Sequence, residues 1–178
     1  YLMGLPLPGY EPRDDNGLAR CRLMKYLYYD EENPLSYPMP TAPEKLSLLY
    51  LPERAANPPT ERGYRLFPQS YVAQSQINAQ TRIMVYMGRT IAADAQHVEM
   101  SVVFDILSNV TTEGNAIALS RTFAMEQCII EALNGVNMGG VGTFYFNRRA
   151  HGDCGSMPIG DRGTNVGRGL TMGLTWME

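Results

Sequence analysis

The sequence predicts an α+β fold, with a mostly antiparallel β-sheet and one main helix packed on it, preceded by an N-terminal helix and a proline-rich extended arm. Three observations lead to this prediction. Eleven of the twelve prolines fall within residues 1–68, and each fixes φ and removes a backbone donor. Apolar side chains alternate along residues 98–106, as in a half-buried strand. Residues 116–134 are apolar except for one narrow polar stripe, as in a covered helix.

Composition sets the broad class of the protein. The 178 residues suit one domain over 16–178 that follows an N-terminal arm over 1–15. A net charge of −3 argues against a nucleic-acid binder held by a basic face. Only 19% of the residues are charged, which suggests that other protein chains cover part of the surface. No apolar run approaches the roughly 18 residues of a membrane span, so we expect no membrane partner.

The cysteines and the first residues bear on the compartment. Cys21, Cys128 and Cys154 are odd in number and widely spaced, which favours a reducing compartment over a disulfide framework. The opening residues 1–10 lack the basic start and the cleavage site of a signal peptide. We therefore expect assembly in the cytoplasm.

Two elements are expected in the first part of the chain. A helix is predicted from about Leu18 to Tyr29, with Leu18, Cys21, Met24 and Tyr28 on one stripe and Leu23 and Leu27 beside it. Asn33-Pro34 would end it. Residues 46–51 could form either a short strand or a helical turn.

The core is expected to begin with a hairpin of strands 81–87 and 97–107, followed by the main helix. Asn115 is the expected N-cap of that helix and Gly135 the expected residue after its C-terminus. Its narrow polar stripe predicts cover on two sides, one by the sheet and the other, as a possibility, by a neighbouring subunit. The stripe consists of Ser120, Gln127, Glu131 and Asn134.

Two further strands are predicted at 143–149 and 168–177, joined by a long glycine-containing loop over 150–167. A structureless loop of that length is uncommon in a compact domain and is usually functional or disordered. We therefore expect it to be an interface loop, with Asp161 and Arg162 among its contact residues; the alternative is a merely mobile hairpin tip.

No residue pattern predicts catalysis, a cofactor or a metal site. His151 and Cys154 share a short segment, but they lack a second ligand pair and sequence neighbours seldom meet as nucleophile and base. The glycine clusters match no phosphate-binding motif. Asp105, inside an apolar strand, must be solvated, paired or shared with another chain. Its candidate partners are Arg82, Arg148 and Arg149. The candidate subunit contacts are Phe123 and Ile130 on the main helix, together with Asp105, Arg148 and Arg149.

The order of elements resembles that of small neck proteins of tailed bacteriophages, above all the tail terminators of long-tailed phages. The resemblance rests on YLYYDEENPLSYPMP, RLFPQS, QTRIMVYMG, VVFDILSN and RGLTMGLTW, and covers about residues 16–178. It implies an α+β subunit of a homohexameric ring, without catalytic activity or cofactor, in the neck of the virion. The ring would terminate the tail tube and join it to the head-side connector.

The partners that the resemblance implies are other copies of the chain, tail tube or sheath proteins, and connector or collar proteins. Genomic DNA would pass through the lumen without specific binding. Two alternatives stay open. One is another connector, head-closure or baseplate component; the other is a small cytosolic enzyme that uses His151 and Cys154.

Overall fold

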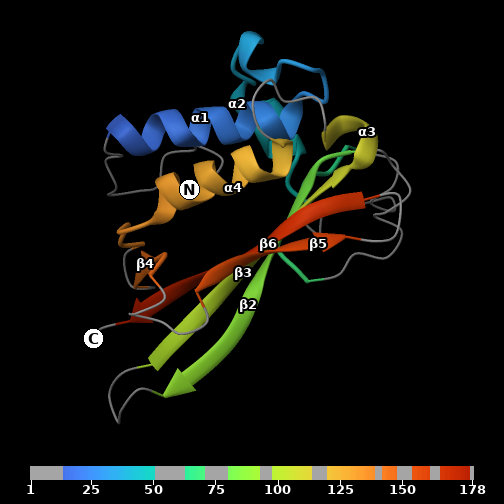
Figure 1. Cartoon of the computed structure of the whole chain (residues 1–178). Helices are drawn as coiled ribbons and strands as arrows, with labels where there is room; N and C mark the ends of the chain where they lie inside the picture. The colour runs from blue at the N-terminus through green and yellow to red at the C-terminus, as the bar shows by residue number, and fades with distance from the viewer. Residues whose placement is uncertain are drawn as a thin grey trace.

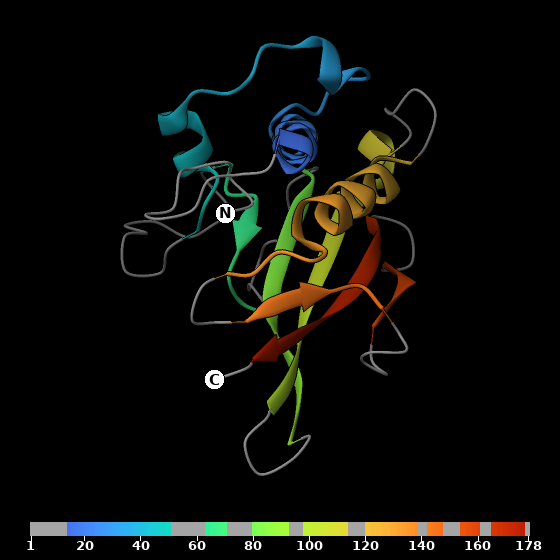
Figure 2. The ribbon, with the colours of Figure 1, turned by 90° about the vertical axis from the view of Figure 1, so that its left-hand side faces the viewer.

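The computed structural model describes residues 14–50, 63–70, 80–92, 98–113, 120–138, 142–147, 154–160 and 165–176. It has two layers (Figures 1 and 2): a twisted sheet, and helices α1 and α4 lying side by side over one of its faces. The architecture is the predicted α+β fold, with a mostly antiparallel sheet of six strands.

Helix α1 (Asp14–Tyr28) packs on α4, and its buried side includes Met24 of the predicted stripe and Leu23 and Leu27 beside it. Its buried side chains are Ala19, Arg20, Leu23, Met24 and Leu27. The prediction was wrong for Leu18, which is 64% exposed, and for Cys21, which is also exposed. Apolar residues surround much of this helix, so periodicity alone did not decide which of two neighbouring stripes faces inward.

Between α1 and the sheet the chain forms short elements only, as its prolines predict. They are the 3₁₀ turn η1 (Pro34–Ser36), helix α2 (Ala42–Ser47) and strand β1 (Leu66–Phe67). The Glu44 carboxylate accepts a hydrogen bond of 2.7 Å from the Thr41 backbone N–H, which satisfies a donor at the start of α2. Residues 46–51 thus contain a helix end and an isolated parallel bridge between Leu49 and Leu66.

Strands β2 (Arg82–Ala92), β3 (Val98–Asn109) and β6 (Asn165–Trp176) form the centre of the sheet. The order is β1-β2-β3-β6-β4, and β1 pairs with β2 in parallel while the other neighbours are antiparallel. β4 (Thr143–Tyr145) and β5 (Gly155–Gly160) share the outer edge of β6. β4 is therefore shorter than the strand predicted at 143–149, and β6 begins three residues before the strand predicted at 168–177.

The β2–β3 hairpin projects away from the helices (Figures 1 and 2). A bulge lies between Met87 and Thr90. There, Ser101 Oγ accepts a 2.7 Å hydrogen bond from the Arg89 N–H and donates one of 3.2 Å to the Arg89 carbonyl. A side chain on Gly88 would begin 2.5 Å from that Oγ, so the bulge depends on this glycine.

Helix α4 (Arg121–Leu133) begins at Ser120, not Asn115, and a one-turn helix α3 (Val110–Glu113) precedes it. Ser120 Oγ accepts a hydrogen bond from the Phe123 N–H and so caps the helix. The prediction missed this N-cap because it began the helix at residue 116. Two sides of α4 are covered, as predicted: one by the sheet and one by α1. The second cover thus includes a helix of the same chain. In the described part of the chain, no helix combines the length and apolarity needed to span a membrane.

Residues 150–167 are not a structureless loop, because they contain β5 and the start of β6. The predicted loop was wrong because β5 contains two glycines and a proline, residues that are usually depleted in strands. At its end Gly160 has φ +156, and a Cβ there would lie 2.5 Å from the Asn165 carbonyl oxygen.

Candidate functional site

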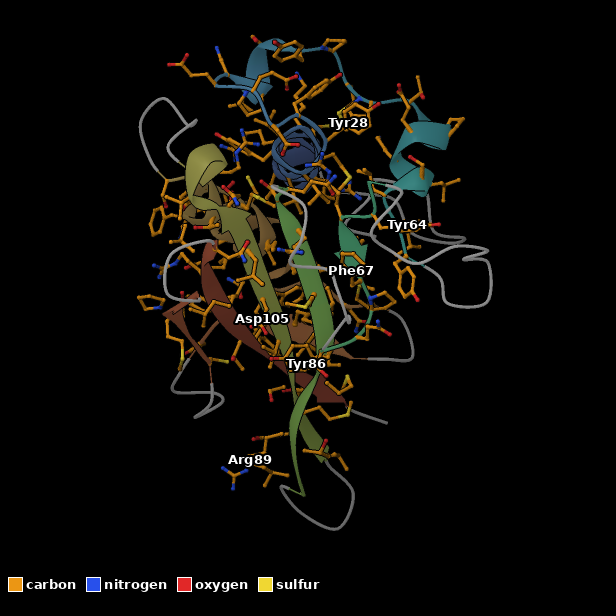
Figure 3. The ribbon with its side chains drawn as sticks, turned by 90° about the vertical axis from the view of Figure 1, so that its right-hand side faces the viewer. Tyr28, Tyr64, Phe67, Tyr86, Arg89 and Asp105 are labelled. Atoms are coloured by element: carbon orange, nitrogen blue, oxygen red, sulfur yellow. The ribbon has the colours of Figure 1, made fainter. Side chains whose placement is uncertain are left out.

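The two faces of the sheet differ in their cover. On the helical face, alternate residues of β3 and β6 are buried in the main core beneath α1 and α4: Val102, Phe104, Ile106, Leu170, Met172 and Leu174. On the opposite face, the described residues form a small cluster of Phe67 and Met84, with Tyr50, Tyr64 and Leu107 against them. Figure 3 shows Tyr64 and Phe67 at one margin of this face, and Asp105 and Tyr86 away from them.

An open cavity of about 480 Å³ lies on this opposite face. Strands β2, β3, β5 and β6 all contribute to its walls, which are polar and apolar in about equal parts. The lining residues are Tyr86, Val103, Asp105, Cys154, Gly155, Ser156, Met157, Ile159, Gly169 and Thr171. Binding sites of proteins are usually concave surfaces of this kind, in which apolar walls carry a few polar groups.

Asp105 and Tyr86 supply the main polar groups of the cavity. The Tyr86 hydroxyl donates a 2.9 Å hydrogen bond to Asp105 Oδ2. Desolvation raises the pKa of Asp105, and the hydrogen bond from Tyr86 opposes this only in part. Desolvation, followed by the neighbouring carboxylate, raises the pKa of Tyr86 to about 12. No cation among the described residues forms an ion pair with Asp105.

The space above Asp105 exists because a glycine lies opposite it in the sheet. Gly169 of β6 is the register partner of Asp105 on one side and of Met157 on the other. A Cβ at position 169 would lie 3.3 Å from Asp105 Oδ1 and 3.3 Å from Ile159 Cγ2. Any side chain here would therefore fill the mouth of the cavity beside the carboxylate.

Of the three predicted partners of Asp105, the structure describes Arg82, and Arg82 does not pair with Asp105. Arg82 lies on the same face, two residues from the register partner of Asp105, and its Nη2 donates a 3.1 Å hydrogen bond to Asn165 Oδ1. Arg148 and Arg149 lie outside the described residues, as do Asp161 and Arg162 of the predicted interface loop.

The two predicted contact residues of α4 lie against this chain's own residues. Ile130 is half-buried and packs against the main core. Phe123 is also half-buried, and the Arg168 guanidinium lies over its ring at 5.3 Å from the centroid. Arg168 also pairs with the buried Glu126 carboxylate, which accepts a 2.8 Å hydrogen bond from Ser156 Oγ. Side chains of α4, β5 and β6 are thereby joined.

Sequence reasoning missed the buried arginines that hold the helical layer. Arg121 is fully buried at the start of α4 and donates to the carbonyl oxygens of Tyr26, in the last turn of α1, and of Tyr29 and Glu31 just after it. Burial lowers its pKa. Arg65 forms two 2.6 Å hydrogen bonds with the Asp30 carboxylate. The sequence shows each arginine as a charged residue beside apolar neighbours, and this pattern does not identify the carbonyl groups or the carboxylate that it binds.

The Cys154 thiol lies inside the fold and contacts backbone groups. It is buried, accepts a 3.1 Å hydrogen bond from the Gly173 N–H, and lies 3.5 Å from the Tyr145 carbonyl oxygen. His151 lies outside the described residues. Within the described ranges, no group of three His, Cys, Asp or Glu side chains could hold a metal ion.

Fold and cavity together define a class: an α+β protein whose sheet is covered by its own helices on one face and carries a polar-floored cavity on the other. The chain belongs to the YomW family, whose model matches residues 21–156, and this family derives from a Bacillus phage. No curated protein and no solved structure gave a significant match.

Proposed function

We propose that the protein is a structural component of a phage virion that assembles into a ring at the neck, ends the tail tube and joins it to the head-side connector. The ring is a homohexamer without catalytic activity or cofactor. Its partners are tail tube or sheath proteins on one side and connector or collar proteins on the other, and genomic DNA passes through the lumen without specific binding.

One observation carries the proposal: among the described residues, no helix covers the second face of the sheet, in a protein of a phage-derived family. Met157 on this face is 64% exposed, and Met87 on the projecting hairpin is 54% exposed. Apolar surface of this kind is typical of protein–protein contacts. In a ring, each subunit offers two different surfaces that meet head to tail, so a bare face and a projecting hairpin are suitable complements.

The test is the mass and symmetry of the purified full-length protein, by mass photometry and negative-stain microscopy. We expect particles of six copies of the 19.8 kDa chain with a central opening, and the same protein in purified virions. Twelve copies would favour a connector or head-closure component instead. A monomer at high concentration, absent from virions, would overturn the proposal.

A separate variant tests whether α4 takes part in the ring. Phe123→Glu places a charge on a half-buried position whose ring now stacks on Arg168. If α4 lies in the contact, the variant folds but does not assemble. A folded, fully assembled Phe123→Glu protein would exclude α4 from the interface and leave the opposite sheet face as the remaining candidate.

A further inference from the structure

We infer that the cavity beside Asp105 is a binding site for the guanidinium group of an arginine side chain that another polypeptide presents. The site is formed within one chain, so the inference does not depend on the proposed ring. It rests on three features of the cavity: a carboxylate with no counter-ion among the described residues, a slot that Gly169 leaves open, and an apolar rim.

The Asp105 carboxylate is held in place for a cation. Its Oδ2 accepts the 2.9 Å hydrogen bond from the hydroxyl of Tyr86, on the neighbouring strand β2 (Figure 3), and its Oδ1 lies beside Gly169. No lysine or arginine in the described part of the chain forms an ion pair with this half-buried carboxylate. A desolvated charge of this kind costs stability until an opposite charge reaches it. The cavity therefore suits a cationic ligand.

The slot above Gly169 favours a guanidinium over an ammonium group. A Cβ at position 169 would lie 3.3 Å from Asp105 Oδ1, on the β3 side, and 3.3 Å from Ile159 Cγ2, on the β5 side. The base of the slot is thus narrow, and a flat group enters it more easily than a tetrahedral one. A guanidinium is planar and more weakly hydrated than an ammonium group, so it loses less hydration energy on entering the site.

The rim of the cavity favours an arginine that belongs to a polypeptide over a free small molecule. Met157 is 64% exposed at this rim, and Val103 and Ile159 extend its apolar part. An arginine stem packs along such a wall while its charged head reaches the carboxylate. Exposed apolar side chains are typical of protein contacts, and the residues that flank the arginine would cover Met157. In the proposed ring, the protein that covers this face supplies the arginine.

The test uses the dilute full-length protein with ¹³C-labelled methionine methyl groups, because Met157 lines the cavity. The probe is a blocked alanine peptide with a central arginine, and the matched peptides carry lysine or uncharged citrulline there. The Met157 signal, assigned with Met157→Leu, is followed at constant ionic strength. We expect the arginine peptide to shift this signal to saturation, the lysine peptide to bind at least about three times more weakly, and the citrulline peptide to have no effect.

Two variants test the two parts of the site. Asp105→Asn removes the charge, and Gly169→Ala fills the slot; each should weaken binding of the arginine peptide at least about tenfold. Glu99→Gln removes a carboxylate further along the same face of β3 and should bind like wild type. Circular dichroism checks the fold, and Asp105→Asn alone decides if Gly169→Ala does not fold.

The contrary results are distinct from one another. No response of Met157 to the arginine peptide, or equal binding by Asp105→Asn, overturns the site. Equal affinity for the lysine peptide overturns the choice of guanidinium, and equal affinity for free agmatine overturns the polypeptide as its source. Mass photometry measures assembly separately. A monomeric protein that binds the arginine peptide at Asp105 overturns the proposed ring and leaves this site standing.

Discussion

The two faces of the sheet differ in how far the chain provides partners for the charged groups that it buries. On the helical face, buried charges have partners inside the chain: Glu126 pairs with Arg168, and Arg121 binds three carbonyl groups. On the opposite face the one partner of Asp105 among the described residues is the hydroxyl of Tyr86, and a cavity lies beside it. A charge that a fold desolvates without a counter-ion costs stability. The contrast supports the proposal that the second face is a contact surface between subunits.

The largest expected effect lies beneath the helices. Ile129→Ala empties a fully buried position of the core, and such changes cost about 2–5 kcal/mol because a cavity remains. The matched change on the opposite face is Met157→Ala at an exposed position, for which we expect less than about 0.5 kcal/mol. Urea unfolding of the dilute protein measures both. Similar losses at the two sites would show that the faces do not differ as described.

A somewhat smaller loss is expected from the polar part of the helical layer. Arg121→Met keeps much of the side-chain volume but leaves three carbonyl groups without their donor, a loss of about 2–3 kcal/mol. The control is Arg22→Met, which breaks the Arg22–Glu131 pair near the surface and should cost less than about 1 kcal/mol. Equal losses in the two variants would argue against Arg121 as the anchor of α1 on α4.

The smallest effect has the opposite sign and separates folding from contact. Desolvation raises the pKa of Asp105 in the folded chain above its unfolded value. The folded state then binds more protons between these two pKa values, so stability falls as the pH rises through that window. Asp105→Asn removes this cost at neutral pH. We expect Tm of the dilute monomer to rise by up to about 3 °C at pH 7, with no gain at a pH below the unfolded pKa.

A lower Tm at pH 7 would mean that the carboxylate stabilises the fold, and the contrast between the faces would then lose its main support. A higher Tm together with impaired assembly would be the sharpest form of the contrast. It would identify Asp105 as a residue kept for contact at the expense of folding stability.

The sequence predicted the helical face of the sheet better than the opposite face. Alternation in residues 98–106 and the narrow stripe of α4 predicted the sheet, the main helix and its double cover, because burial inside one chain leaves a periodic trace. Two predictions were wrong: the placement of Leu18 and Cys21 on the inward side of α1, and the loop where the structure has β5. In the first, apolar residues continued around the helix; in the second, Gly155, Pro158 and Gly160 concealed a strand that pairs with β6.

The candidate site was visible only as one anomaly, a carboxylate inside an apolar strand. Its hydrogen-bond partner Tyr86 comes from β2 and the gap above it from Gly169 of β6, 64 residues further along the chain. Neither residue signals this from its own neighbours in sequence. The register of β3 with both strands brings them together, and register depends on the whole sheet.

Footprinting of the assembled protein tests the central claim most directly, because the chain carries a reporter on each surface. Met157 is exposed at the cavity, and Cys21 is exposed on α1. Brief oxidation and thiol labelling, read by mass spectrometry, compare the dilute monomer with the assembled particle. The account predicts that Met157 becomes protected on assembly while Cys21 stays reactive. Protection of Cys21 with Met157 still oxidised at the monomer's rate would contradict it.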